Sequence, residues 1–234
     1  MLKIRTVKKL VSNHINEYVQ KDKRKLYEQL IKDYLTSHSV RKLQLGAGYN
    51  LLPGWLNTDI YSPSPEIVLL DVREPFPIQE QSLDYILSEH HIEHLTYLEG
   101  LAMLRECYRV LKPGGKVRIA TPDLAVLIQL YTAQPKNDVQ QKYIQFMIDN
   151  FMPDIGIYHE SFVINNAFQN WGHKFLYDRP TLEQLMAKVG FVQLTHYKPG
   201  ESDDVNFCGV EGRVKSNISE INFFETMVLE GTRP

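Results

Sequence analysis

The stretch Leu43-Gln44-Leu45-Gly46-Ala47-Gly48 decides the fold, because an apolar strand runs directly into a turn that contains two glycines. A second stretch, Val110-Leu111-Lys112-Pro113-Gly114-Gly115-Lys116-Val117, is typical of a helix end, a tight turn and another strand. Glycine in the first turn permits positive φ and lets a ligand approach the backbone without a Cβ in the way. Together the two stretches predict one nucleotide-type ligand held at the C-terminal edge of a parallel sheet.

Strands and helices alternate along the central part of the chain. Apolar runs predict strands at residues 40–45, 55–60, 67–70, 84–88, 116–121, 191–197 and 225–230. Helical spacing of apolar residues predicts helices at 98–111 and 181–189, the second of which stops at Gly190. Such alternation is typical of crossover units, so we expect an α/β fold with a doubly wound, mostly parallel sheet.

Two segments do not follow this alternation. Residues 1–38 have apolar side chains at helical spacing on both sides of a polar run, which predicts an N-terminal helical extension. Such an extension either packs on the domain or covers its ligand site. Residues 124–170 predict a helical insertion, with helices at 124–131 and 139–151, inside a domain that spans residues 39–234.

The composition excludes several classes of function. The chain has 26 Lys and Arg against 28 Asp and Glu, a net charge of −2, which argues against a general nucleic-acid binder. Its first 36 residues are basic, which is typical of a solvated helix face or of a contact with an anionic partner. Two cysteines imply no disulfide framework. No secretory signal and no apolar run of the roughly 20 residues that span a bilayer are visible, so we expect a soluble, cytoplasmic protein.

Acidic residues follow two successive predicted strands. Asp59 lies at the end of the second strand, where a carboxylate can accept two hydrogen bonds from a ribose diol. Asp71 follows the third strand at the same edge and can accept from an adenine amino group. Each acid alone is explained equally well as a loop carboxylate or a helix cap. Their joint position after a glycine turn favours an adenosine-containing ligand.

The run from Asp71 to Leu95 resembles the middle of a class I S-adenosylmethionine-dependent methyltransferase of the type 11 group. The run from Leu104 to Gly115 (LRECYRVLKPGG) is similar to the signature after that family's helix, and residues 172–177 (GHKFLY) to its C-terminal part. The resemblance is strong over residues 40–125 and looser over 170–230. It implies a Rossmann-like seven-stranded sheet whose last strand is antiparallel, and S-adenosyl-L-methionine as cofactor, with S-adenosyl-L-homocysteine as its product.

The resemblance also implies which residues contact the cofactor. These residues are Leu45, Gly46, Ala47, Gly48, Asp59, Ile60, Asp71, Val72, Ser88 and Glu89. Gly46 and Gly48 would line its methionine and ribose portion, and Ser88 and Glu89 would lie near the methionyl end or the sulfonium.

At the adenosine end, the resemblance implies that Asp59 binds the ribose hydroxyls, that Asp71 binds the adenine region and that Val72 packs on the adenine. The chain departs from the family pattern at three points. Gln44 replaces the usual acid of the first motif, and Asn50 stands where a third glycine is common. The third departure is the short spacing from the glycine turn to Asp59, which leaves room only for a stub of helix.

Histidines supply the candidates for proton transfer. His90 follows the fourth predicted strand, where the reactive methyl group should point, so a neutral imidazole there can accept a proton from an acceptor hydroxyl. His173 is the alternative base. His90 and His94 are four residues apart, but an acid directly precedes the second of them, which is not the His-Glu-x-x-His arrangement. We therefore predict no metal site from this spacing.

The sequence predicts a methyltransferase that acts on an oxygen of a small molecule or a glycan. The type 11 subgroup that it resembles is often associated with glycan modification. One alternative is an NAD(P)-dependent reductase, which would prefer Gly-x-Gly-x-x-Gly, whereas position 51 is Leu51. The other alternative is a cofactor-binding subunit without turnover. Nucleic acid is not an expected partner.

Overall fold

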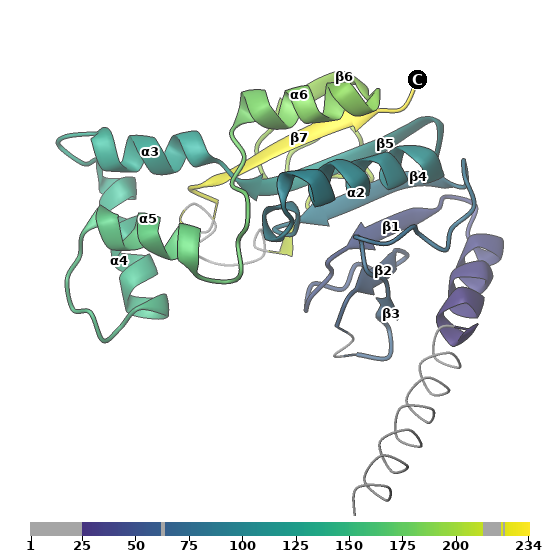
Figure 1. The fold of residues 1–234 in the computed structure, drawn as a ribbon, viewed down its shortest axis with the longest axis horizontal. Helices are drawn as coiled ribbons and strands as arrows, with labels where there is room; N and C mark the ends of the chain where they lie inside the picture. Colours follow the sequence, from purple (N-terminus) through teal and green to yellow (C-terminus); the bar gives the residue numbers. More distant parts are fainter. Residues whose placement is uncertain (1–24, 62–63, 213–220, 222) are drawn as a thin grey trace, which may run out of the picture.

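The computed structural model describes residues 25–61, 64–212, 221 and 223–234 (Figure 1). The part of the predicted N-terminal extension that precedes residue 25 therefore lies outside the described residues. The strands of the described chain form a seven-stranded sheet with the order β3-β2-β1-β4-β5-β7-β6. No helix in these ranges is both long enough and apolar enough to cross a membrane.

The sheet confirms the predicted architecture. Its strands are β1 (Lys42–Leu45), β2 (Leu56–Asp59), β3 (Val68–Leu69), β4 (Leu83–Glu89), β5 (Leu111–Pro122), β6 (Val192–Tyr197) and β7 (Thr226–Thr232). Strands β1 to β5 pair in parallel, and β7 runs antiparallel to both β5 and β6. This order brings the carboxyl ends of β1, β2 and β4 to one edge, which is where ligands bind in open α/β sheets.

The helices begin and end at recognisable signals. They are η1 (Ile92–His94), α2 (Tyr97–Val110), α3 (Leu124–Thr132), α4 (Asp138–Phe151), α5 (Glu160–Gln169), α6 (Arg179–Val189) and a helix at residues 25–37. Thr96 and Glu99 form a capping box at the start of α2. Gly190 ends α6 at a φ of 116°, as its position in the sequence predicts.

The two faces of the sheet are covered differently. Helices α2 and α6 lie side by side over one face, and their side chains share the main core with β1, β4 and β5 (Figure 1). On the other face, Trp55 and Leu87 pack against Phe207 and Val210, which come from the coil before β7. Residues 46–55 contain no helix, in agreement with the short spacing between the glycine turn and Asp59.

The helix at residues 25–37 packs on the domain. Its Ile31 is buried in the main core. The Tyr34 hydroxyl donates to the carbonyl of Lys42 at 2.9 Å and accepts from the N–H of the same residue at 2.8 Å. Because Lys42 begins β1, this helix contacts the edge of the sheet opposite to the predicted ligand edge. The described part of the extension therefore does not cover the ligand site.

Helices α3, α4 and α5 lie in the segment predicted to be an insertion, at the left of Figure 1. The first two agree with the predicted positions, whereas α5 has mixed polar residues and no clear apolar stripe from which to predict it. The insertion has an apolar cluster of its own, in which Leu130, Met147 and Val163 are buried. The Tyr143 hydroxyl donates to Glu225, next to β7, which ties the insertion to the sheet.

Residues 112–115 form a bulge in β5 at the predicted turn. Leu83 pairs with Leu111 and Tyr85 pairs with Lys116, so one residue of β4 faces four of β5. Gly114 adopts a φ of 79°, and its N–H donates to the carbonyl of Arg233 at 2.8 Å.

Arg118 of β5 is buried between two carboxylates. Its Nε donates to Glu211 at 2.6 Å and its Nη1 to Glu230 at 2.5 Å. Because Arg118→Met would leave both carboxylates buried without this cation, we expect it to lower the free energy of unfolding by about 3–5 kcal/mol. Urea denaturation measures this change. Lys112→Ala removes a partly exposed ion pair and should cost less than about 1 kcal/mol; equal losses in the two variants would contradict the prediction.

Candidate active site

The glycine turn after β1 and the acid at the end of β2 are in direct contact. The N–H of Gly48 donates to Asp59 Oδ2 at 3.0 Å, and the N–H of Tyr61 donates to Oδ1 at 3.0 Å. The N–H of Ala47 donates to the carbonyl of Thr58 at 2.9 Å. A carboxylate oxygen can accept more than one hydrogen bond, so Asp59 can still receive hydroxyl donors from a ligand that lies over the turn.

Gly46 lies against the ring of His91. A Cβ at this glycine would be 2.5 Å from His91 Cδ2, and its φ is 67°. Only glycine therefore fits here. Burial lowers the pKa of His91, and the acids Glu93 and Asp59 oppose this effect only in part, so the ring is neutral at pH 7. No feature of the histidine run in the sequence separates His91 from its neighbours.

Asp71 lies at the same edge as Asp59, because β3 pairs in parallel with β2 and Asp71 follows β3 by two residues. Its oxygens accept from Arg73 Nε at 2.8 Å and from Arg73 Nη2 at 2.6 Å. Hydrogen bonds from this guanidinium hold the pKa of Asp71 below its usual value. An adenine at this position would share the Asp71 carboxylate with Arg73.

Ser88 and Glu89 end β4 beside the glycine turn. Ser88 pairs with Leu45, and its buried hydroxyl has no hydrogen-bond partner within the described ranges. Glu89 Oε2 accepts from Asn50 Nδ2 at 3.2 Å and from the N–H of Gly212 at 3.0 Å. Asn50 therefore has a structural use at the position where the family often has glycine: it connects the turn to the segment before β7.

The other predicted cofactor residues differ in exposure. Leu45, Ala47 and Val72 are buried, whereas Ile60 is 56% exposed. Gln44, which replaces the usual acid, is buried and donates from Nε2 to the carbonyl of Asn50 at 3.0 Å, which closes the turn. The turn thus offers open space beside Gly48, where no atom lies within 4 Å of a Cβ position, and an acid with spare acceptor capacity. Both features fit an adenosyl ligand.

A cavity of about 750 Å³ is lined by Tyr49 and His90. Tyr49 directly follows Gly48, so this cavity borders the residue after the glycine turn. The other apolar and aromatic side chains of its lining come mostly from α4 and the segment before α6; they are Tyr143, Phe146, Met147, Phe151, Trp171 and Ile221. We call it the acceptor cavity. Its size and aromatic walls suit a ring-bearing ligand.

His90 lines the acceptor cavity with both ring nitrogens near protein oxygens. Nδ1 is 3.3 Å from Glu93 Oε1, and Nε2 is 3.0 Å from Thr226 Oγ1. The backbone of His90 has a φ of 45°, an uncommon value that marks functional sites more often than other positions. An imidazole placed between a carboxylate and a hydroxyl is arranged for proton transfer.

Glu93 is fully buried at the wall of the same cavity. Thr121 Oγ1 donates to its Oε2 at 3.0 Å. Burial alone would raise the pKa of Glu93, but interactions with His90 and His94 outweigh it and lower the pKa to about 2. The carboxylate is therefore ionised at neutral pH.

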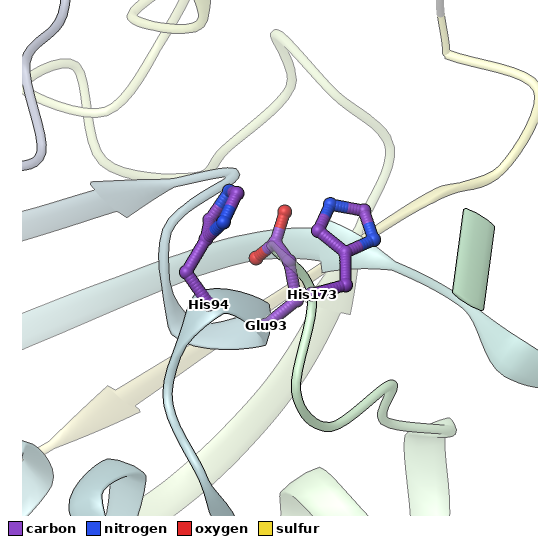
Figure 2. A group of neighbouring side chains, drawn as sticks. All are labelled: Glu93, His94 and His173. Atoms are coloured by element: carbon purple, nitrogen blue, oxygen red, sulfur yellow. The ribbon is translucent and has the colours of Figure 1, made fainter. Parts of the chain in front are cut away.

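His173 lies beside Glu93 and His94 (Figure 2). The N–H groups of Lys174 and Phe175 donate to the carbonyl of Glu93 at 2.8 and 3.2 Å, which places the segment before α6 against η1. Both candidate bases, His90 and His173, therefore line one cavity. Their proximity depends on these backbone contacts, and no spacing in the sequence predicts it.

A known protein family matches the part of the chain that contains the glycine turn and the two acids. The family described as "Methyltransferase domain" matches residues 47–119, from the glycine turn through most of β5. This match includes both acids and His90. Over this segment the chain is similar to S-adenosylmethionine-dependent methyltransferases, and the strand order of the sheet agrees with the fold expected for them.

Curated relatives share part of the chain. The demethylmenaquinone methyltransferase of Lactococcus lactis subsp. lactis (strain IL1403) is 27% identical over 146 residues, which cover 61% of this chain and 52% of the relative. The ubiquinone/menaquinone biosynthesis C-methyltransferase UbiE of Pseudoalteromonas translucida (strain TAC 125) is 27% identical over 130 residues, which cover 53% and 44%. The aligned part thus spans about half the length of these relatives.

Among solved structures, an S-adenosylmethionine-dependent methyltransferase from Mesorhizobium loti has the same fold. The TM-score is 0.50 at 13% sequence identity, over 83% of this chain and 91% of that chain. A likeness at this identity concerns the fold alone.

Proposed function

We propose that this protein transfers the methyl group of S-adenosylmethionine to a hydroxyl oxygen of a ring-bearing small molecule or glycan. The observation that carries this proposal is the acceptor cavity, which borders the residue after the glycine turn and combines aromatic walls with an imidazole–carboxylate pair. Aromatic side chains stack on planar rings and on the apolar faces of sugars. The imidazole serves a hydroxyl acceptor, which must lose a proton.

In this proposal the glycine turn and Asp59 hold the adenosyl ligand at the ends of β1 and β2, with Asp71 at its adenine end. The open space beside Gly48 lets the ligand approach the backbone, and Asp59 accepts from the ribose hydroxyls. His90 and the acceptor cavity would then lie at the methyl end of the bound cofactor. This placement follows the order of the strand ends and the continuity of the cavity with Tyr49.

When bound, S-adenosylmethionine supplies a methyl group on a sulfonium, so an O–C bond forms as the C–S bond breaks. The aromatic walls of the cavity orient the acceptor, and orientation supplies much of the acceleration. His90 Nε2 accepts the hydroxyl proton in place of its present contact with Thr226 Oγ1. The ionised Glu93 then stabilises the resulting imidazolium through Nδ1.

The variant His90→Ala tests the role of the base. We expect kcat to fall about 10²–10⁴-fold, the usual contribution of a positioned general base, while the Kd for S-adenosylhomocysteine changes little. Steady-state kinetics and calorimetry measure the two quantities. His38→Ala is the matched control, because His38 stacks on Tyr34 and does not line the acceptor cavity. An unchanged kcat in His90→Ala would exclude His90 as the base.

Methylation of a ring carbon is the second candidate, and the names of the two curated relatives favour it. A panel of phenols, quinols and sugars with labelled S-adenosylmethionine distinguishes the two reactions, because NMR of the product separates O-methyl from C-methyl groups. S-adenosylhomocysteine binding without product from any acceptor would instead favour a subunit that has no turnover. Tighter binding of NADH than of S-adenosylhomocysteine would favour the reductase.

A further inference from the structure

We propose that Glu93, His94 and His173 bind one divalent transition-metal cation, of which Zn²⁺ is the best match, at the wall of the acceptor cavity. The three side chains come from η1 and from the segment before α6, and they gather around one point (Figure 2). One carboxylate and two imidazoles form a ligand set that Zn²⁺ commonly uses when a fourth position stays open for water or substrate.

The distances are compatible with coordination after a small adjustment. One ligand atom from each residue lies within 4.8 Å of the other two. Ligands about 2.0–2.1 Å from a tetrahedral Zn²⁺ lie roughly 3.4 Å from one another. Side-chain rotations that shorten the longest separation by roughly 1.4 Å would therefore complete the site, without movement of the backbone that holds His173 against η1.

The hydrogen bonds of the two imidazoles prepare them for a cation. His173 Nδ1 is 2.7 Å from the carbonyl oxygen of Ala167, which can only accept, so Nδ1 carries the proton and Nε2 keeps its lone pair. His94 also has a backbone hydrogen bond with Trp171. Metal-binding histidines usually donate their second ring N–H to a carbonyl or a carboxylate.

The carboxylate supplies an independent observation. Glu93 is fully buried, and its Oε1 has no hydrogen-bond partner among the described residues. His90 Nδ1 is 3.3 Å from this oxygen and forms an ion pair with it only when the imidazole is protonated. A buried carboxylate oxygen without a donor is costly, and a cation beside it would compensate for that cost.

Ring packing alone explains less of this arrangement. The rings of His94 and His173 meet edge to face at 4.9 Å, which is an ordinary aromatic contact. That contact explains why the imidazoles are neighbours. It does not explain why a charged, incompletely bonded carboxylate is buried beside them.

The cation would present its open position to the acceptor cavity, which all three ligands line. There it would bind the hydroxyl oxygen of the acceptor. It would stabilise the anion that forms when the hydroxyl proton passes to His90. This use of the cation depends on the proposed methyl transfer to oxygen, whereas binding of the cation does not.

Calorimetric titration of the chelator-treated protein with Zn²⁺ tests the site directly. We expect one Zn²⁺ per chain, and a four-coordinate absorption spectrum when Co²⁺ replaces it. His173→Ala and His94→Ala should each weaken Zn²⁺ binding by more than about 100-fold, because loss of an outer partner alone costs roughly 10–100-fold. His38→Ala removes a histidine outside the cavity and should bind as wild type does.

The affinity for S-adenosylhomocysteine, measured in the same variants, shows whether they remain folded. The absence of heat with Zn²⁺ in wild type would overturn the proposal, and so would unchanged Zn²⁺ binding in His173→Ala, which would indicate adventitious binding elsewhere. Either result, together with intact cofactor binding and methyl transfer, would remove the metal site and leave the proposed function in place.

Discussion

Gly46→Ala is expected to abolish measurable binding of S-adenosylhomocysteine. The new Cβ would lie 2.5 Å from the ring of His91, at a φ of 67° that residues with a side chain adopt at a cost of about 1–2 kcal/mol. Displacement of the buried His91 ring costs about 1–3 kcal/mol more. Because the turn carries the proposed cofactor contacts, these costs fall on the binding site. Calorimetry measures the affinity, and thermal unfolding measures the stability.

Gly48→Ala is the matched control for this change. Gly48 also has positive φ, 52°, but no atom lies within 4 Å of the position of its Cβ. In the ligand-free protein, Gly48→Ala should therefore cost only the backbone strain, about 1–2 kcal/mol of stability, without the clash with His91. The double variant Gly46→Ala/His91→Ala removes the clash and should recover part of the lost affinity. Similar affinities in Gly46→Ala and wild type would show that the ligand does not use this turn.

Asp59→Ala is expected to weaken S-adenosylhomocysteine binding about 100-fold, since hydrogen bonds to a charged group are worth about 1.5–3 kcal/mol each. The variant loses the proposed bonds to the ribose hydroxyls. It also loses the contact with the N–H of Gly48 that holds the turn. Calorimetric titration with S-adenosylhomocysteine measures the change in Kd.

Asp71→Ala removes the same kind of side chain from the neighbouring strand end. Its effect should be smaller, because Arg73 already occupies both oxygens of Asp71. His90→Ala should affect this Kd least, since His90 faces the acceptor. The predicted order of affinity loss is thus Asp59, then Asp71, then His90. A reversed order would contradict the placement of the adenosyl ligand.

The sheet could be predicted from the sequence because its signals are local. Apolar runs that end in glycine or acidic residues gave the positions of the strands, and Gly190 gave the end of α6. The length of each strand is harder to predict from these signals. Strand β3 contains only Val68–Leu69, because its described pairing with β2 at the edge of the sheet involves just these residues.

The chemistry of the site depends on contacts between distant residues, which local patterns do not encode. His91 matters because Gly46 of another strand end packs on its ring. Glu93 meets His173 because backbone N–H groups of Lys174 and Phe175 bond to its carbonyl. The histidine run suggested proton transfer by His90. A rule based on the spacing of His90 and His94 could not include His173, which comes from the segment before α6.

A crystal structure with S-adenosylhomocysteine tests the central claim most directly. The account predicts that the ribose hydroxyls lie within hydrogen-bonding distance of the Asp59 carboxylate, above the turn at Gly46, with the sulfur facing His90 and the acceptor cavity. A ligand bound away from this turn, or an Asp59 side chain that makes no contact with it, would contradict the account.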